Sequence, residues 1–173
     1  MGMTKVEKQH GIPVDCSREV PTWLVLLDNL PTVGMFYLGA LLVMMVWWPL
    51  AFVFFGYCAI SIVLFWGLIC PYCHHFNTKA CPCGYGIIAP RFFKFKGAEN
   101  FARVFRSRIA VVFPAWIIPP IAAVYLLVQD HTDIVVWGLF IAYAIIGFVL
   151  IPAISKFVGC RNCEIKDRCP WMS

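Results

Sequence analysis

The sequence contains a run from Leu30 to Asn77 without a single charged side chain. As one helix this run would be about 70 Å long, more than twice the roughly 30 Å thickness of the hydrocarbon core of a bilayer. The run must therefore fold back on itself. Trp47-Trp48-Pro49 supplies the break, because proline suits the first turn of a new helix and tryptophan favours the membrane interface. We predict two membrane spans here, over residues 31–48 and 50–70.

Two further uncharged runs follow in the second half, at 109–128 and 134–154, with residues 129–133 as the polar turn between them. Only 13% of the residues are charged, against roughly 25% in an ordinary soluble domain. This composition excludes a disordered segment and a module with a broad charged face, such as a helix-turn-helix reader of DNA. We predict an all-α integral membrane protein with four transmembrane helices in two hairpins, a small cysteine-rich cytoplasmic cap and interfacial amphipathic helices.

The basic residues decide the orientation. With an even number of spans, both termini and the long central loop share one side, and all 14 lysines and arginines fall on that side. The positive-inside rule then predicts a multi-pass protein of the plasma membrane with both termini in the cytoplasm. The net charge of +5 is explained by this topology and by anionic headgroups of the lipid bilayer, so nucleic acid is not expected as a partner.

The chain divides into five predicted regions. They are a cytoplasmic arm with a short interfacial helix (1–30), a first hairpin (31–70), a cysteine-rich and basic cytoplasmic loop (71–108), a second hairpin (109–154) and a cytoplasmic tail (155–173). In the loop, Ala98, Phe101, Ala102 and Phe105 follow the i, i+3, i+4, i+7 spacing of an amphipathic helix lying on the membrane. Small residues in the spans, among them Gly34, Gly39, Gly138 and Gly147, predict close helix packing.

Seven of the nine cysteines form two groups directly after the second and fourth spans. Thiols clustered on the cytoplasmic side are read as metal ligands or redox groups rather than structural disulfides, because the cytosol is reducing. The first group is Cys70, Cys73, Cys81 and Cys83, whose four thiolates suffice for one tetrahedral zinc or for an iron–sulfur cluster of the 4Fe–4S type. Cys58 lies inside the second span, where we expect it to pack as a small apolar side chain.

The second group is Cys160, Cys163 and Cys169, followed by Pro170. Its spacing resembles the first three cysteines of the auxiliary iron–sulfur motif in radical SAM enzymes of the SPASM type. The position of that motif's fourth cysteine is Ser173 here, and the chain has no radical SAM core, so the resemblance concerns ligand spacing alone. A fourth ligand could come from Cys16, His74, His75 or a partner chain.

The spans lack features that other membrane functions need. None of the four predicted spans contains a histidine, which removes the bis-histidine haem of a b-type cytochrome. They also lack acidic and basic residues, which disfavours a channel or pump.

Three functions remain, and whether the chain is an enzyme stays open. The first is an iron–sulfur electron-transfer component of a membrane complex, exchanging electrons with a soluble or integral redox protein and with a quinone. The second is a structural adaptor whose cap is held by zinc. The third is a membrane thiol-disulfide oxidoreductase similar to the vitamin K epoxide reductase family, with Cys70 and Cys73 as the redox pair.

Overall fold

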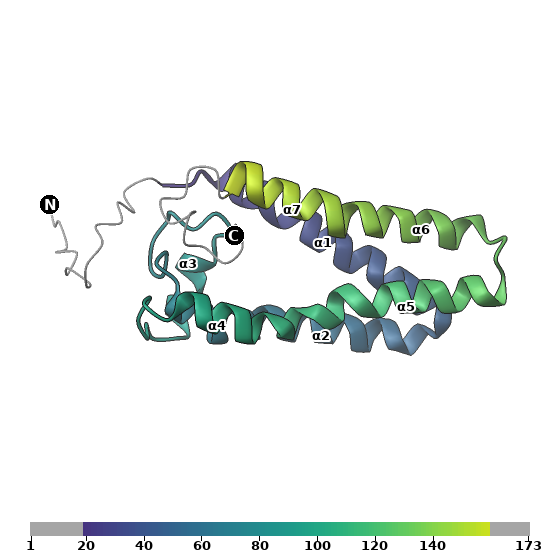
Figure 1. The fold of residues 1–173 in the computed structure, drawn as a ribbon, viewed down its shortest axis with the longest axis horizontal. Coiled ribbons are helices and arrows are strands. Elements are labelled where there is room, and N and C mark those ends of the chain that lie inside the picture. Colours follow the sequence, from purple (N-terminus) through teal and green to yellow (C-terminus); the bar gives the residue numbers. More distant parts are fainter. Residues whose placement is uncertain (1–18, 160–173) are drawn as a thin grey trace, which may run out of the picture.

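The computed structural model describes residues 19–159, and within them the regular secondary structure is entirely helical, with no strand. The long helices form an elongated bundle, and a cap of short helices and turns covers one end (Figure 1). The larger elements are α1 (Thr22–Val46), α2 (Trp48–Leu68), α3 (Tyr85–Ile88), α4 (Phe101–Arg108), α5 (Phe113–Gln129), α6 (Ile134–Ala144) and α7 (Ile151–Ile154). Short 3₁₀ turns η1 (Cys70–Tyr72), η2 (Ala89–Arg91) and η3 (Ile109–Val112) and the π-helical segments η4 (Ile145–Leu150) and η5 (Ser155–Gly159) join them.

Four helical stretches are long and apolar enough to cross a membrane, as predicted. They are Thr22–Val46, Trp48–Tyr72, Phe101–Gln129 and Ile134–Phe157. The predicted break between the first two is confirmed, since Trp47 is extended (φ −163°, ψ 119°) and Pro49 lies in the first turn of α2. The turn before the fourth stretch is also confirmed. There the carboxylate of Asp133 caps α6 by accepting the backbone N–H groups of Val135 and Val136, at 2.9 and 3.2 Å.

The predicted division at Pro31 is wrong. α1 runs without interruption through Pro31, so the expected short interfacial helix is the first part of the span itself. Proline removes one helical hydrogen bond, a cost that membrane helices tolerate because neighbouring helices support them. The span consequently includes Asp28, contrary to the expectation of spans without charged residues.

The predicted amphipathic helix of the central loop begins later than expected. α4 starts at Phe101, so Ala98 lies outside it, and α4 continues through η3 directly into α5. Its apolar face includes buried Val104, while Arg103 and Arg106 are exposed.

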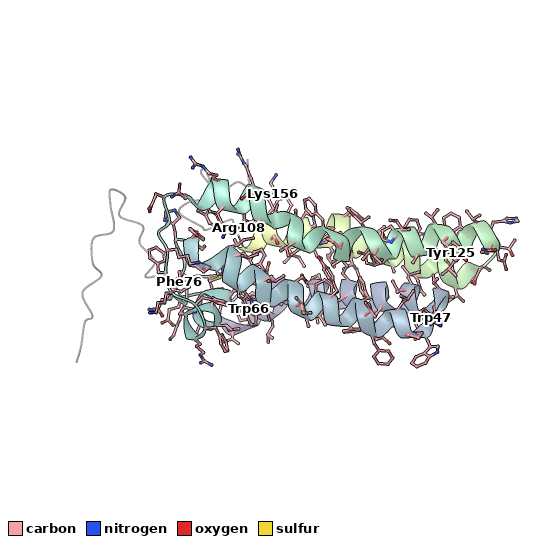
Figure 2. The ribbon with its side chains drawn as sticks, turned by 90° about the horizontal axis from the view of Figure 1, so that it is seen from below. Trp47, Trp66, Phe76, Arg108, Tyr125 and Lys156 are labelled. Carbon is pink, nitrogen blue, oxygen red and sulfur yellow. The ribbon has the colours of Figure 1, made fainter. Side chains whose placement is uncertain are left out.

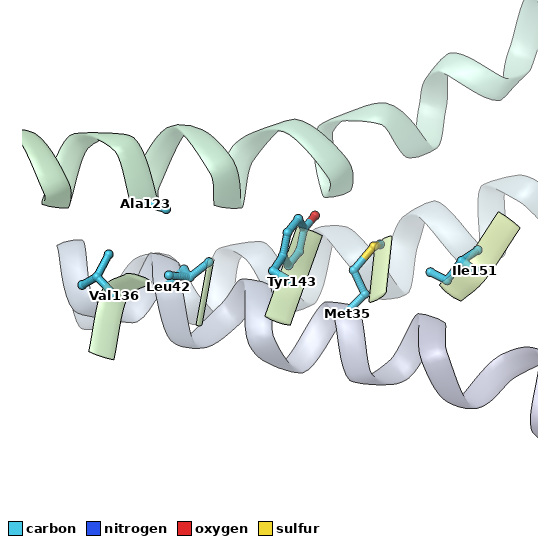
Figure 3. Packing of buried hydrophobic residues seen from close by; sticks show 6 residues of the cluster. All are labelled: Met35, Leu42, Ala123, Val136, Tyr143 and Ile151. Atoms are coloured by element: carbon cyan, nitrogen blue, oxygen red, sulfur yellow. The ribbon is translucent and has the colours of Figure 1, made fainter. Parts of the chain in front are cut away.

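Close packing around α1 forms the core. Figure 3 shows six of its buried residues, Met35, Leu42, Ala123, Val136, Tyr143 and Ile151, contributed by α1, α5, α6 and α7. A Cβ at Gly39 would lie 2.8 Å from Cγ of Pro119 and 3.1 Å from the ring of Phe54, so only glycine permits this approach of α1, α2 and α5. Cys58 is buried in the second core cluster, as predicted.

The two ends of the bundle differ in their side chains. Figure 2 shows Phe76, Trp66, Arg108 and Lys156 toward the capped end, with Trp47 and Tyr125 toward the other. At the uncapped end, the turn between α5 and α6 carries Asp130 and Asp133, and all lysines and arginines of the described residues belong to segments at the capped end.

Candidate functional site

The cap begins where α2 ends, with the Cys70-Pro-Tyr-Cys73 turn. Pro71 prevents the α-helix from continuing regularly, and the chain tightens into η1, in which the N–H of Cys73 donates to the carbonyl of Cys70 at 3.0 Å. Cys70 is buried, and Cys73 is partly exposed. The two thiols of the turn therefore lie directly after the C-terminal end of α2, where the membrane helix meets the cap.

Two cations flank this turn. Arg108 donates to the carbonyl of Leu68 at 3.0 Å and lies over the ring of Tyr72, 5.4 Å from its centroid. The ammonium of Lys96 lies 5.9 Å from the centroid of the same ring, and its backbone N–H donates to Pro71. Arg108 thus satisfies one of the carbonyls left without a helical partner at the end of α2, and both cations hold Tyr72 by cation–π contact.

The second pair of thiols lies in the tight loop Cys81-Pro82-Cys83-Gly84. Gly84 has a left-handed conformation (φ 74°), and its N–H donates to the carbonyl of Cys81 at 3.0 Å, which closes the turn. Two residues later, a Cβ at Gly86 would lie 2.8 Å from both the carbonyl oxygen of Thr78 and Cβ of Cys81, and closer still to the carbonyl oxygen of His75. Glycine at both positions lets the backbone wrap closely around Cys81.

The sulfur of Cys81 lies in a nest of hydrogen-bond donors. The groups that lower its pKa are the thiol of Cys83 and the backbone N–H groups of Gly86, Cys83 and Tyr85. The thiol hydrogen bond is the largest cause that lowers the pKa of Cys81 from its ordinary value of 9.0 to about 7, and the backbone donors act in the same direction against desolvation. Near neutral pH, Cys81 therefore has a larger thiolate fraction than an ordinary cysteine.

Cys83 has the opposite tendency. Its hydrogen bond to Cys81, its burial and the nearby carboxylate of Asp28 raise its pKa well above the ordinary value. Burial also raises the pKa of Tyr85, and negative charge on Cys83, Asp28, Cys70 and Cys81 adds to this effect.

Helix α1 contributes two residues that sequence reasoning missed. The side-chain amide of Asn29 donates to the carbonyl of Cys83 at 3.1 Å and accepts from the hydroxyl of Tyr85 at 3.1 Å. The hydroxyl of Ser155 donates to the carboxylate of Asp28 at 3.5 Å, and Asp28 is among the groups that raise the pKa of Cys83. The only signal in the sequence is an Asp-Asn pair beside an apolar run.

The predicted alternative ligands His74 and His75 also lie in the cap. The ring of His74 packs edge-on against Phe101, with centroids 6.5 Å apart, and His75 is 9% exposed. The predicted second group, Cys160, Cys163 and Cys169, lies outside the described residues, as does Cys16.

The cap thiols do not form a preformed metal site in the part of the chain that the structure describes. Over residues 19–159, no three side chains of cysteine, histidine, aspartate or glutamate converge in an arrangement that could hold a metal ion. The structure places Cys81 and Cys83 in one tight loop and Cys73 one turn from Cys70. What this arrangement provides is one stabilised thiolate with further thiols around it.

Comparison with known proteins gives no additional guidance, since no family model, no curated protein and no solved structure matches this chain.

Proposed function

We propose that this chain is a plasma-membrane iron–sulfur protein in which Cys70, Cys73, Cys81 and Cys83 ligate a cluster that exchanges electrons with a membrane or soluble partner. The observation that carries the proposal is the tight loop from Cys81 to Gly86, which the N–H of Gly84 closes on the carbonyl of Cys81 and whose backbone N–H groups lower the pKa of Cys81. A thiolate is the form of cysteine that binds metal, and hydrogen bonds to the ligating sulfur both stabilise it and tune the potential of a cluster.

The donor set suits a thiophilic metal. All four candidate ligands are cysteines of one cap, and soft thiolates select iron–sulfur clusters or zinc over oxygen-preferring ions. Because no three donors already converge among the described residues, metal binding has to draw the thiols toward a common centre, as is usual where binding is coupled to folding. When bound, a cluster would supply one-electron transfer at the membrane surface.

The orientation follows from charge. The described lysines and arginines belong to segments at the capped end, and the positive-inside rule places such an end in the cytoplasm. In this proposal the two helix pairs α1–α2 and α5–α6 are the membrane hairpins, and the cap faces a reducing compartment in which its thiols stay available for metal. The cysteines at 160, 163 and 169 would provide part of a second site.

Zinc is the competing metal. Cys81-Pro82-Cys83-Gly84 is the type of proline-containing turn found in zinc ribbons, and a closed zinc site would make the cap a structural adaptor. The metal content of the protein separates these two functions.

A dithiol function is favoured by a different observation. Cys81 and Cys83 share a hydrogen bond, and their pKa values are displaced in opposite directions. A stabilised thiolate next to a protonated thiol is the arrangement of a redox-active pair. In a thiol-disulfide oxidoreductase of this kind, the redox-active pair would be Cys81 and Cys83 rather than the predicted pair Cys70 and Cys73.

Cysteine replacement tests the proposed ligand set. We expect Cys81→Ser to lose the iron and sulfide of one complete cluster from protein purified anaerobically. Cys58→Ala is the matched control, because Cys58 is buried in the bundle and is not among the proposed ligands. Full iron and sulfide in Cys81→Ser, or equal loss in Cys58→Ala, would contradict the assignment.

A further inference from the structure

Two cations meet at one tyrosine where α2 joins the cap. The guanidinium of Arg108 and the ammonium of Lys96 lie 5.4 and 5.9 Å from the centroid of the Tyr72 ring. We call Lys96 and Arg108 the cation pair. Arg108 comes from the end of α4, and Lys96 comes from the loop before that helix. Lys96 is exposed, and Arg108 and Tyr72 are partly exposed, so both charges can be reached from outside the protein.

No carboxylate neutralises the cation pair in the part of the chain that the structure describes. Over residues 19–159 the one ion pair joins Lys79 to Glu19, and it involves neither Lys96 nor Arg108. Two like charges beside one ring repel each other, and a bound anion removes this repulsion. One N–H group of Arg108 donates to the carbonyl of Leu68, and a guanidinium has further N–H donors that suit an anion such as phosphate.

The cation pair lies at the end of the membrane spans. Tyr72 is the last residue of the apolar stretch Trp48–Tyr72, and Arg108 is the last charged residue before the uncharged run 109–128. Figure 2 shows Arg108 toward the capped end of the bundle. Tyrosine and basic side chains at the ends of membrane helices are typical of the interface, which is where phospholipid phosphates lie.

Apolar side chains continue from the cation pair along the bundle. Leu64 precedes Leu68 by one helical turn on α2 and is 39% exposed, and Phe113, the first residue of α5, is 49% exposed. The hydroxyl of Tyr57 donates to the carbonyl of Val111, which holds α2 beside η3. A phosphate at the cation pair therefore has exposed apolar surface on its membrane side, as a phospholipid requires and a soluble phosphate does not.

We propose that the cation pair binds the phosphate of an anionic phospholipid in the leaflet on the capped side. Tyr72 holds the two cations in place, and the acyl chains of the lipid lie against α2 and α5. The bound lipid fastens the 71–108 loop to the membrane through Lys96 and Arg108. Binding of this lipid does not require the proposed cluster.

Lipid retention tests this site. The full chain is purified in a neutral detergent, supplied with phosphatidylglycerol or with phosphatidylcholine of the same acyl chains, and measured by native mass spectrometry. We expect phosphatidylglycerol to bind about tenfold more tightly, because phosphatidylcholine carries its own cation beside the phosphate. Equal retention of the two lipids would overturn the proposal. Displacement of phosphatidylglycerol by inorganic phosphate would assign the cation pair to a soluble anion and would also overturn it.

Removal of matched charges locates the lipid. We expect Lys96→Gln combined with Arg108→Gln to weaken phosphatidylglycerol binding about thirtyfold. Lys94→Gln combined with Arg103→Gln removes the same net charge at two exposed positions and should retain the binding. Equal losses in the two double variants would show attraction to surface charge in general and would overturn the site.

Two single variants separate loss of the site from loosening of the cap. Lys96→Gln preserves the hydrogen bond from its backbone N–H to Pro71, and Arg108→Lys preserves the positive charge. We expect Lys96→Gln to weaken binding about fivefold and Arg108→Lys to retain most of it. Unchanged binding in Lys96→Gln, or complete loss in Arg108→Lys, would overturn a site that depends on the charges of both residues.

Discussion

In the membrane bundle the buried contacts are almost entirely apolar, whereas in the cap the elements are joined by hydrogen bonds of thiols, an amide and a guanidinium. Within the described residues, Ser61 is the one buried polar residue of the spans, and the core clusters contain apolar side chains and Tyr143. In the cap, Asn29, Asp28 and Arg108 make the contacts between segments distant in sequence. The bundle therefore contains most of the apolar core, and the cap contains the polar contacts around the candidate site. Substitutions in the two regions should have separable effects.

The largest effect is expected from overpacking the bundle. Gly39→Leu places atoms where Pro119 and Phe54 already lie and should destabilise the fold by about 3 kcal/mol. Gly56→Leu is the matched control, since a Cβ at Gly56 has nothing within 4 Å, and it should change stability by no more than about 0.5 kcal/mol. Thermal unfolding in detergent measures both. Equal melting temperatures of the two variants would contradict the packing described for α1.

The next effect separates the cap from the bundle. Asn29→Ala removes the hydrogen bonds to Cys83 and Tyr85 and leaves the carbonyl of Cys83 without this donor, which should destabilise the cap by about 2 kcal/mol. Hydrogen exchange should become faster at residues 81–86 and stay unchanged in α5 and α6. Asn100→Ala is a suitable control, because Asn100 is exposed and makes no side-chain cap of α4. Uniformly faster exchange throughout the bundle would show that the two regions are not separable.

The reactivity of the two neighbouring thiols sharpens the comparison within the cap. In metal-free protein, Cys81 should react with iodoacetamide about tenfold faster than Cys83 at pH 7, because its thiolate is stabilised and that of Cys83 is not. The pKa of Cys81 is lowered on folding, so the stabilisation from its thiolate is complete above pH 9.0 and is lost as the pH falls through about 7. Tandem mass spectrometry of the alkylated peptide locates the label. Equal labelling of both residues across this pH range would contradict the hydrogen-bond assignment.

The smallest effect concerns the cation at the junction of bundle and cap. Arg108→Gln loses the hydrogen bond to Leu68 and the contact with Tyr72, and it should reduce local stability by about 1 kcal/mol. Arg103→Gln removes the same charge at an exposed position of α4 and should have no measurable effect. Proteolysis of the 70–100 segment under native conditions provides the measurement. A matching increase in both variants would assign the effect to net charge rather than to the contacts of Arg108.

The helices of the bundle could be predicted because each depends on local properties of the sequence. Charge-free runs gave the four spans, and Pro49 and Asp133 gave two of the helix starts. Pro31 was misleading. Proline usually ends a helix in a soluble protein, but a membrane helix tolerates a proline in its interior, and α1 continues through Pro31. The π-helical segment η4 had no local signal of its own.

The cap could be predicted only in part. The spacing of the cysteines predicts Cys70, Cys73, Cys81 and Cys83 as one ligand group, which stays a prediction, and Gly84 and Gly86 lie in the tight turn beside Cys81. The contributions of Asp28 and Asn29 depend on a contact between residues 54 positions apart, which spacing alone does not reveal. Metal binding by these thiols, and the identity of the metal, stay predictions.

The most direct test of the account is the iron, acid-labile sulfide and zinc content of the full chain purified without oxygen, with an absorption spectrum before and after dithionite. We predict iron and sulfide in equal amounts, with a band near about 400 nm that dithionite bleaches, as expected for a cysteine-ligated cluster. Zinc alone with a featureless visible spectrum would contradict the electron-transfer function and identify the cap as a zinc-stabilised adaptor. Protein without either metal, and with Cys81 joined to Cys83, would assign the site to dithiol chemistry.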